Sequence, residues 1–124
     1  MSENLIKDYI EQNDIEVEIG IEDKEGNELT KHEIKQNPIL LAKYYSVFFS
    51  EFKVIYDKME DKTPLKGIYE SNQKIFEFIY GQNALINSGS IYSSQWEMQL
   101  MDYVLENYSI ISNFFNQFWE VLDL

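Results

Sequence analysis

Apolar side chains recur along the last third of the chain at alternating steps of four and three residues. One row consists of Val104, Tyr108, Ile111, Phe115, Phe118 and Leu122. A second row beside it consists of Tyr103, Ile110, Phe114, Val121 and Leu124. This spacing puts both rows on one side of an α-helix, and it predicts a helix of about 28 residues that begins at a Ser94–Glu97 capping box. Because the apolar arc is wide, we expect two helices, or one helix and a second subunit, to cover it.

Two earlier segments show the same helical spacing. The first starts at Asn37-Pro38, runs to about residue 60, and carries the row Leu41, Tyr45, Phe48, Phe52, Ile55 and Met59. The second starts at Thr63-Pro64, with Thr63 as the expected N-cap, and Asn72 interrupts its apolar row. Its apolar positions are Leu65, Ile68, Ile75, Phe76 and Ile79. Together with the last helix, these segments predict an antiparallel three-helix bundle over residues 38–124.

The pattern differs in residues 1–37. Residues 3–12 predict a short helix, and a strict period of two follows it. The alternating residues are Ile15, Val17, Ile19 and Ile21 on one face and Glu16, Glu18, Gly20 and Glu22 on the other. This predicts a strand with a buried face and an acidic face, followed by a turn and a short return strand that leads into a helical turn. In the alternative, Thr30 itself caps a helical turn, since Thr30-x-x-Glu33 matches a capping box. The fold class expected is mainly α, in one domain, with a small N-terminal β-hairpin or strand element.

Charge is strongly negative and unevenly placed. The formal net charge is −12, the sequence pI is about 4.3, and the ten basic residues are all lysine. Without arginine, which forms the bidentate contacts to phosphates and guanine edges, we expect no direct nucleic-acid binding. Carboxylates crowd residues 11–28 around a single lysine, and every residue after Lys74 is neutral or acidic. Two acidic surfaces are therefore expected, one on the N-terminal element and one along the last helix.

Candidate catalytic and metal-binding residues are scarce. The chain has no cysteine and one histidine, His32, which lies in a polar segment. It has neither a glycine-rich phosphate loop nor a Glu-x-x-His pair. We therefore expect no catalytic site, no bound metal and no cofactor. The chain also lacks a signal-peptide pattern and an apolar run long enough to span a bilayer, so we expect a cytoplasmic protein without membrane contact.

These features favour a non-enzymatic protein-binding module whose partner has a basic surface. The expected contact residues are the early carboxylates Glu16, Glu18, Glu22, Asp23 and Glu25 and the aromatic anchors Phe49, Tyr56 and Trp119. The three rings are chosen because they lie off the main apolar rows, and Tyr and Trp are favoured interface anchors. The bias toward Ile, Asn, Lys, Tyr and Phe indicates an AT-rich genome. We therefore interpret the chain as a phage- or mobile-element-encoded inhibitor of a host protein, of the anti-defence type. A nucleic-acid mimic is its most specific form.

Three other interpretations stay open. The carboxylates can simply form a solvated face that keeps the protein soluble. The wide apolar arc of the last helix also fits a structural or assembly protein, such as a phage tail-assembly chaperone or a helical homo-oligomer. The many rings could instead line the pocket of a small-ligand carrier or an enzyme.

Overall fold

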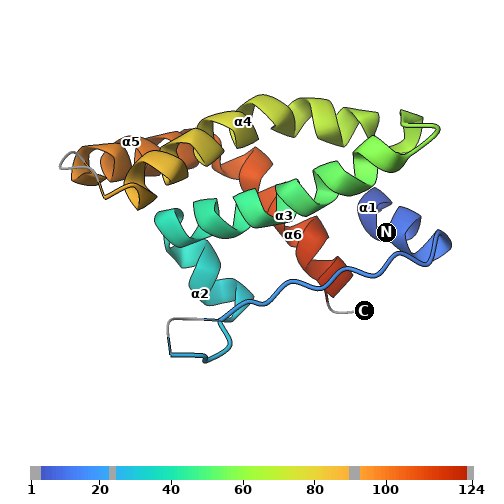
Figure 1. Cartoon of the computed structure of the whole chain (residues 1–124), viewed down its shortest axis with the longest axis horizontal. Coiled ribbons are helices and arrows are strands. Elements are labelled where there is room, and N and C mark those ends of the chain that lie inside the picture. The colour runs from blue at the N-terminus through green and yellow to red at the C-terminus, as the bar shows by residue number, and fades with distance from the viewer. Residues whose placement is uncertain (1–3, 23–24, 90–92, 123–124) are drawn as a thin grey trace.

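Helices dominate the computed structural model, which describes residues 4–22, 25–89 and 93–122. In that part of the chain they are α1 (Leu5–Gln12), α2 (Lys31–Gln36), α3 (Pro38–Lys58), α4 (Thr63–Asn87), α5 (Ser93–Glu106) and α6 (Tyr108–Leu122). Figure 1 shows α3 and α4 along the length of the molecule, with α6 crossing behind α3. The mainly helical prediction is confirmed. Within the described ranges, no helix combines the length and apolar character needed to cross a membrane.

The start of α3 has the predicted capping residue, whereas the start of α4 does not. The Asn37 carboxamide oxygen accepts the N–H groups of Ile39 and Leu40 at 3.1 and 3.2 Å, as an N-cap does. At α4 the predicted cap is wrong by one residue, because Thr63 is already helical and Lys62 is the N-cap, without a side-chain capping hydrogen bond. The N–H of Thr63 donates instead to the carboxylate of Asp61, the residue before the cap, at 3.0 Å. Hydrogen bonds from Thr63 hold the pKa of Asp61 below its usual value.

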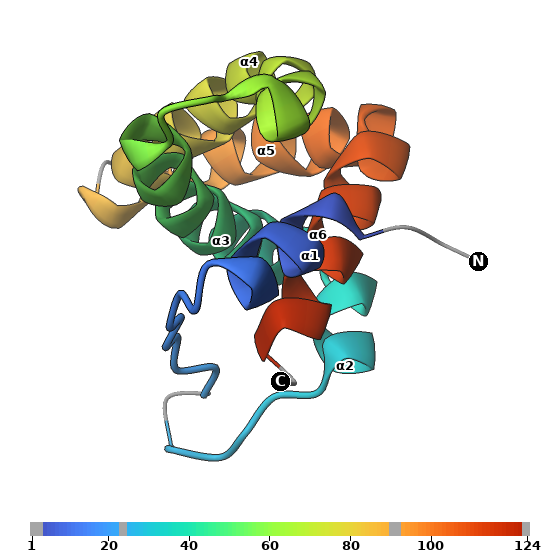
Figure 2. The ribbon, with the colours of Figure 1, turned by 90° about the vertical axis from the view of Figure 1, so that its right-hand side faces the viewer.

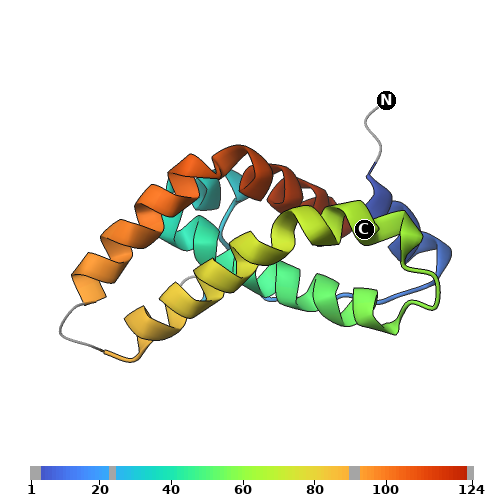
Figure 3. The ribbon, with the colours of Figure 1, turned by 90° about the horizontal axis from the view of Figure 1, so that it is seen from above.

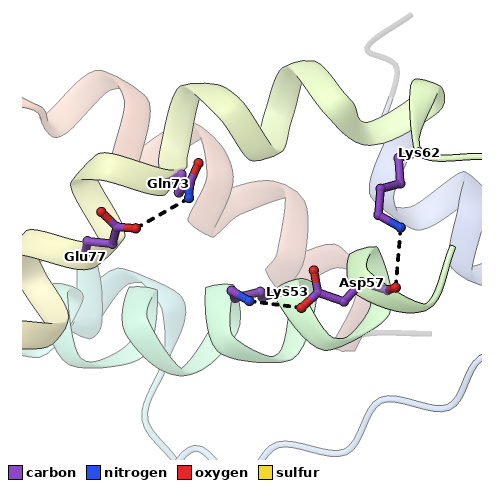
Figure 4. A network of polar contacts seen from close by, with 5 residues as sticks. All are labelled: Lys53, Asp57, Lys62, Gln73 and Glu77. Atoms are coloured by element: carbon purple, nitrogen blue, oxygen red, sulfur yellow. Dashed lines mark hydrogen bonds and ion pairs between the residues drawn. The ribbon is translucent and has the colours of Figure 1, made fainter.

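Two lysines interact with the C-terminal end of α3, next to its connection to α4. Lys62 donates to the carbonyl oxygen of Asp57 at 3.4 Å, near the end of α3 (Figure 4). It also donates to the carbonyl oxygen of Met59 at 2.8 Å. Lys53 pairs with Asp57 at 2.9 Å one turn earlier on the same helix. A cation at a helix C-terminus satisfies carbonyls that have no intrahelical partner. These lysines therefore stabilise the helix end locally.

Aromatic rings on α3 join it to α6 and α4. Phe48 stacks on Phe115 and Phe118 of α6, with ring centroids 5.2 and 5.1 Å away. Its neighbour Phe49 meets Phe76 of α4 at 4.8 Å and Phe114 of α6 at 5.4 Å. Consecutive residues of a helix point about 100° apart, so neighbouring rings of α3 can pack against two different helices. The core of the protein lies between these three helices.

A buried polar pair explains the interruption in the apolar row of α4. Asn72 accepts a hydrogen bond from the Tyr45 hydroxyl at 2.9 Å, and its own amide donates to the carbonyl of Ile68 at 2.9 Å. Both residues are buried. Burial, with Tyr103 adding an electrostatic contribution, raises the pKa of Tyr45 well above its usual value. The pair fixes the register of α4 against α3.

The predicted long C-terminal helix is two helices, which meet at Asn107. Its side-chain amide donates to the carbonyl of Tyr103 at 2.9 Å, and that carbonyl also accepts the Asn107 N–H at 3.1 Å. The Tyr103 carbonyl therefore accepts from both the backbone and the side chain of Asn107, and the N–H of Ile111 still donates to the carbonyl of Asn107 at 3.0 Å. Figure 3 shows α5 and α6 as an arch over the other helices. Tyr108 is exposed although Ile111, Phe115 and Phe118 of the same predicted row are buried.

The predicted start of that helix is also displaced. The helix α5 begins at Ser93, so the expected cap Ser94 lies inside it. Residues 90–92, which precede it, and Leu124, the last member of the second apolar row, lie outside the described residues.

The N-terminal hairpin does not form. Among the described residues the β pairing consists of one antiparallel bridge, Glu22 to Glu28, and residues 15–21 form no strand. The extended return segment pairs only near Glu28 and ends at Thr30, after which the chain turns into α2. Thr30 and Glu33 make a reciprocal capping box that starts α2. The alternating segment therefore has no neighbouring strand to complete a ladder.

We expect Phe115→Ala to lower the free energy of unfolding by about 3–5 kcal/mol, because it removes a fully buried ring from the α3–α6 stack. Denaturant unfolding followed by circular dichroism measures the change. The control Val54→Ala, at an exposed site on α3, should change stability by less than about 0.5 kcal/mol. A loss below 1 kcal/mol for Phe115→Ala, on the order of a surface substitution, would place that ring outside the core.

We expect Tyr45→Phe to cost about 1–3 kcal/mol, because it leaves the buried Asn72 oxygen without its donor. The tyrosine should also contribute a pH dependence. The unfolded chain ionises it near pH 10 and the folded protein does so only well above that value. Its stabilising effect is thus complete below pH 10 and is lost as the pH rises further. Unfolding curves in alkaline buffers should therefore decline less steeply for Tyr45→Phe than for the wild type.

Candidate functional site

The acidic segment, residues 15–22, crosses the molecule from α1 toward the turn before α2 and passes the end of α6 (Figures 1 and 2). Its first residue is held by a hydrogen bond from the N–H of Ile15 to the carbonyl of Ile10, at 3.1 Å. Its last residue is held by the Tyr44 hydroxyl, which donates to the carbonyl of Glu22 at 3.1 Å. The segment is therefore attached at both ends to helices of the core.

The helix α1, where the segment begins, is itself fixed to α6. The Asn4 side-chain amide donates to the carbonyl of Gln117 and to the carboxylate of Glu120, both at 2.8 Å. The Asn4 oxygen meanwhile accepts the N–H of Lys7 and caps α1. The acidic segment thus keeps a defined position relative to α6.

The predicted alternation of buried and acidic positions is present without a sheet. Ile15, Val17, Ile19 and Ile21 are half-buried against the core, whereas Glu16, Glu18 and Glu22 are exposed. Within the described ranges, no lysine lies at ion-pair distance from these three carboxylates, and Lys53 and Lys66 pair with Asp57 and Glu70 instead. Carboxylates two residues apart on an extended chain are roughly 6.6 Å apart. The segment therefore presents a row of negative charge to the solvent.

Two shallow hollows run along this row and share Leu122. The first, about 280 Å³, is lined by Ile19, Gly20, Ile21, Glu22, Glu28, Leu29, Trp119 and Leu122. The second, about 250 Å³, is lined by Ile10, Ile15, Glu16, Val17, Glu18, Val121 and Leu122. The structure thus brings Trp119 from the end of the chain next to Glu22 from its beginning.

Trp119 combines a fixed position with an accessible edge. Its ring packs on Phe115 at 5.6 Å and Phe48 at 6.4 Å, and the residue is only half-buried. An aromatic ring that the core already orders loses little entropy on contact with a partner. Beside a row of carboxylates, it can supply apolar contact area while the charges supply long-range attraction.

Two of the three predicted aromatic anchors are not at the surface. Phe49 is 0% exposed and Tyr56 is 7% exposed, and Tyr56 stacks on Tyr69 with centroids 4.2 Å apart. Their surface placement was a wrong prediction, because α3 is covered on two sides and buries more than one helical row. Glu25 is exposed in the turn, and Asp23 lies outside the described residues.

Glu28 belongs to the site although it was not singled out as a contact residue. The Glu22–Glu28 bridge brings it into the hollow beside Trp119. The sequence signal that could have found it is the turn at residues 23–27, which returns the chain alongside Glu22. Only the bridge seen in the structure shows which residue of the returning chain lies opposite Glu22.

Other regions offer less chemistry. His32 is exposed on α2, and the described residues contain no group of three or more His, Asp or Glu side chains arranged to hold a metal ion. An open hollow of about 600 Å³ lies between α3 and α4, with Leu40, Val47 and Tyr80 in its wall. Aliphatic and amide groups line most of it, and Tyr80 is its one ring. This lining differs from the aromatic pocket considered from the sequence.

The chain was compared with protein-family models, with curated proteins and with solved structures, and none of the three comparisons gives a significant match.

Proposed function

We propose that this protein is a non-enzymatic protein-binding module that docks its acidic segment on a basic surface of another protein. The observation that carries the proposal is the fixed row of Glu16, Glu18 and Glu22 beside the half-buried ring of Trp119. Complementary charge speeds and orients association. A desolvated aromatic side chain supplies the affinity that charge alone does not.

The proposal extends to inhibition. A rigid row of carboxylates can occupy a lysine- or arginine-rich groove that otherwise binds nucleic acid, so the bound protein would block that groove. The composition of the chain, with lysine in place of arginine, supports an origin in a phage or mobile element whose target is a host defence protein. In this proposal the protein acts by occupying a surface, and it needs no reaction of its own.

Replacing Glu16, Glu18 and Glu22 with Lys should weaken partner binding by at least about tenfold and remove its salt dependence, because the charge complementarity is reversed. Helix content and melting temperature should stay nearly unchanged, since all three side chains are exposed. The measurement is capture of partners from a cell lysate at low and high salt, followed by titration of the captured protein.

The matched control is Glu60→Lys/Glu70→Lys/Glu77→Lys, which makes the same change in net charge on exposed positions elsewhere. It should retain most of the binding. If the acidic-segment variant binds as well as this control, the segment is not the contact surface.

The neighbourhood of Trp119 can be tested without a partner. In a Trp96→Phe background Trp119 is the remaining tryptophan. Relative to their quenching of free N-acetyltryptophanamide, caesium ions should quench its fluorescence more strongly than iodide does, because nearby carboxylates concentrate cations and repel anions. Adding Glu22→Lys and Glu28→Lys should reverse this order, and high salt should reduce the difference. Equal relative quenching by both ions in the parent protein would mean that Trp119 is not in an acidic environment.

A further inference from the structure

A second exposed surface lies on α5, away from the acidic segment. Met98 and Leu105 are 66% and 58% exposed, and Met101 and Tyr108 are 38% and 37% exposed. Their spacing of three, four and three residues puts Met98, Met101 and Leu105 on one face of α5, with Tyr108, the first residue of α6, next in line. We call these four residues the α5 stripe. Single exposed apolar residues are ordinary, but four in one line form a patch that commonly marks a binding site.

The stripe is separate from the face by which α5 joins the core. Leu100 and Val104 of α5 are fully buried, and Tyr103 stacks on Phe78 of α4 with centroids 4.0 Å apart. At about 100° per residue, the middle of the stripe lies roughly 120° around the helix from Leu100. The helix thus has one apolar face that packs inside the protein and another that faces outward. Figure 3 shows α5 along an outer edge of the molecule.

The stripe continues into a shallow hollow at the bend between α5 and α6. This hollow has a volume of about 640 Å³, and Leu105, Tyr108, Ser112 and Asn116 are among its lining residues. At its far end the Lys35 ammonium donates to the Asn116 side chain at 3.1 Å. The apolar surface and the hollow together are long enough to receive about three turns of a helix, since four residues over ten positions span about 15 Å.

The charges beside the stripe indicate what could bind it. Glu97, Asp102 and Glu106 on α5 are all exposed, and no lysine follows Lys74 in the chain. A symmetric pairing of two copies through this stripe would place these carboxylates against their equivalents, which is unfavourable. The four side chains also form a patch that is small compared with the surface area of roughly 800 Å² that each partner buries in a stable interface. The acidic flanks instead complement a partner with basic flanks.

We propose that the α5 stripe binds a basic amphipathic helix of another protein. The apolar residues of such a helix, at steps of three and four, would contact Met98, Met101 and Leu105, and its lysine or arginine residues would face Glu97, Asp102 and Glu106. The flexible, polarisable side chains of methionine suit a helix-binding surface, because they adapt to different apolar partners. This site is independent of the acidic segment, so either proposal can fail without the other.

The test uses a fluorescent amphipathic peptide of leucine and lysine, with leucines at helical spacing, and a second peptide of the same composition in scrambled order. Fluorescence anisotropy with the full chain should show tighter binding of the amphipathic peptide. Met98→Gln/Met101→Gln/Leu105→Gln should weaken that binding by at least about tenfold. The control Val54→Gln/Leu85→Gln removes exposed apolar side chains elsewhere and should change it less than about twofold.

A second variant, Glu97→Lys/Asp102→Lys/Glu106→Lys, leaves the apolar residues in place and should also weaken binding, with the loss reduced at high salt. Circular dichroism checks that each variant keeps its helices. The acidic-segment variant Glu16→Lys/Glu18→Lys/Glu22→Lys should bind the peptide within about threefold of the wild type, since it changes only distant charge.

Three results would overturn the proposal. The first is equal binding of the two peptides, which would mean that charge alone drives association. The second is undiminished binding by the glutamine variant of the stripe. The third is light scattering that shows a wild-type dimer and a monomeric glutamine variant, because a second copy would then be the occupant.

Discussion

The structure depends on the packing of consecutive aromatic residues of α3 against two different helices. Phe48 stacks on rings of α6, while Phe49 reaches Phe76 of α4. Aromatic side chains bury large areas and prefer offset or tilted contacts, so each contact also restricts the relative rotation of the helices. Because α3 fixes the positions of α4 and α6 in this way, the C-terminal end of α6 lies next to the acidic segment. Without that packing Trp119 and Glu22 would not share a surface.

The acidic segment presents negative charge to the solvent because its apolar side chains turn inward. In the acidic segment the isoleucines and Val17 face the core, and the glutamates between them must face the solvent. Backbone pairing contributes little there, so the segment is held by apolar contacts and by hydrogen bonds at its two ends. Such a segment presents charge in a defined order without a sheet. That property is what a docking surface for a basic partner requires.

The outward face of α5 forms the second surface. Met98, Met101 and Leu105 are exposed on that face, while Leu100 and Val104 of the same helix are buried in the core. Tyr108, the first residue of α6, follows Leu105 at helical spacing and is exposed as well. Two surfaces with different chemistry result, one extended and charged, the other helical and apolar with acidic flanks.

The sequence by itself determined four features: the helical class, the apolar rows of α3 and α4, the start of α3 at Asn37-Pro38, and the alternation of residues 15–22. Each of them depends on contacts between near neighbours in the chain or on the period of the pattern. The tertiary structure alone decided three other features. These are the burial of Phe49 and Tyr56, the hydrogen bond between Tyr45 and Asn72, and the position of Trp119 beside Glu22 and Glu28. Each of these depends on which helix lies opposite, and a one-dimensional pattern does not specify that. The missing hairpin has a local cause instead. The alternation specifies which side chains turn inward, but a strand also needs a neighbour, and the return segment ends at Thr30, whose capping box with Glu33 starts α2.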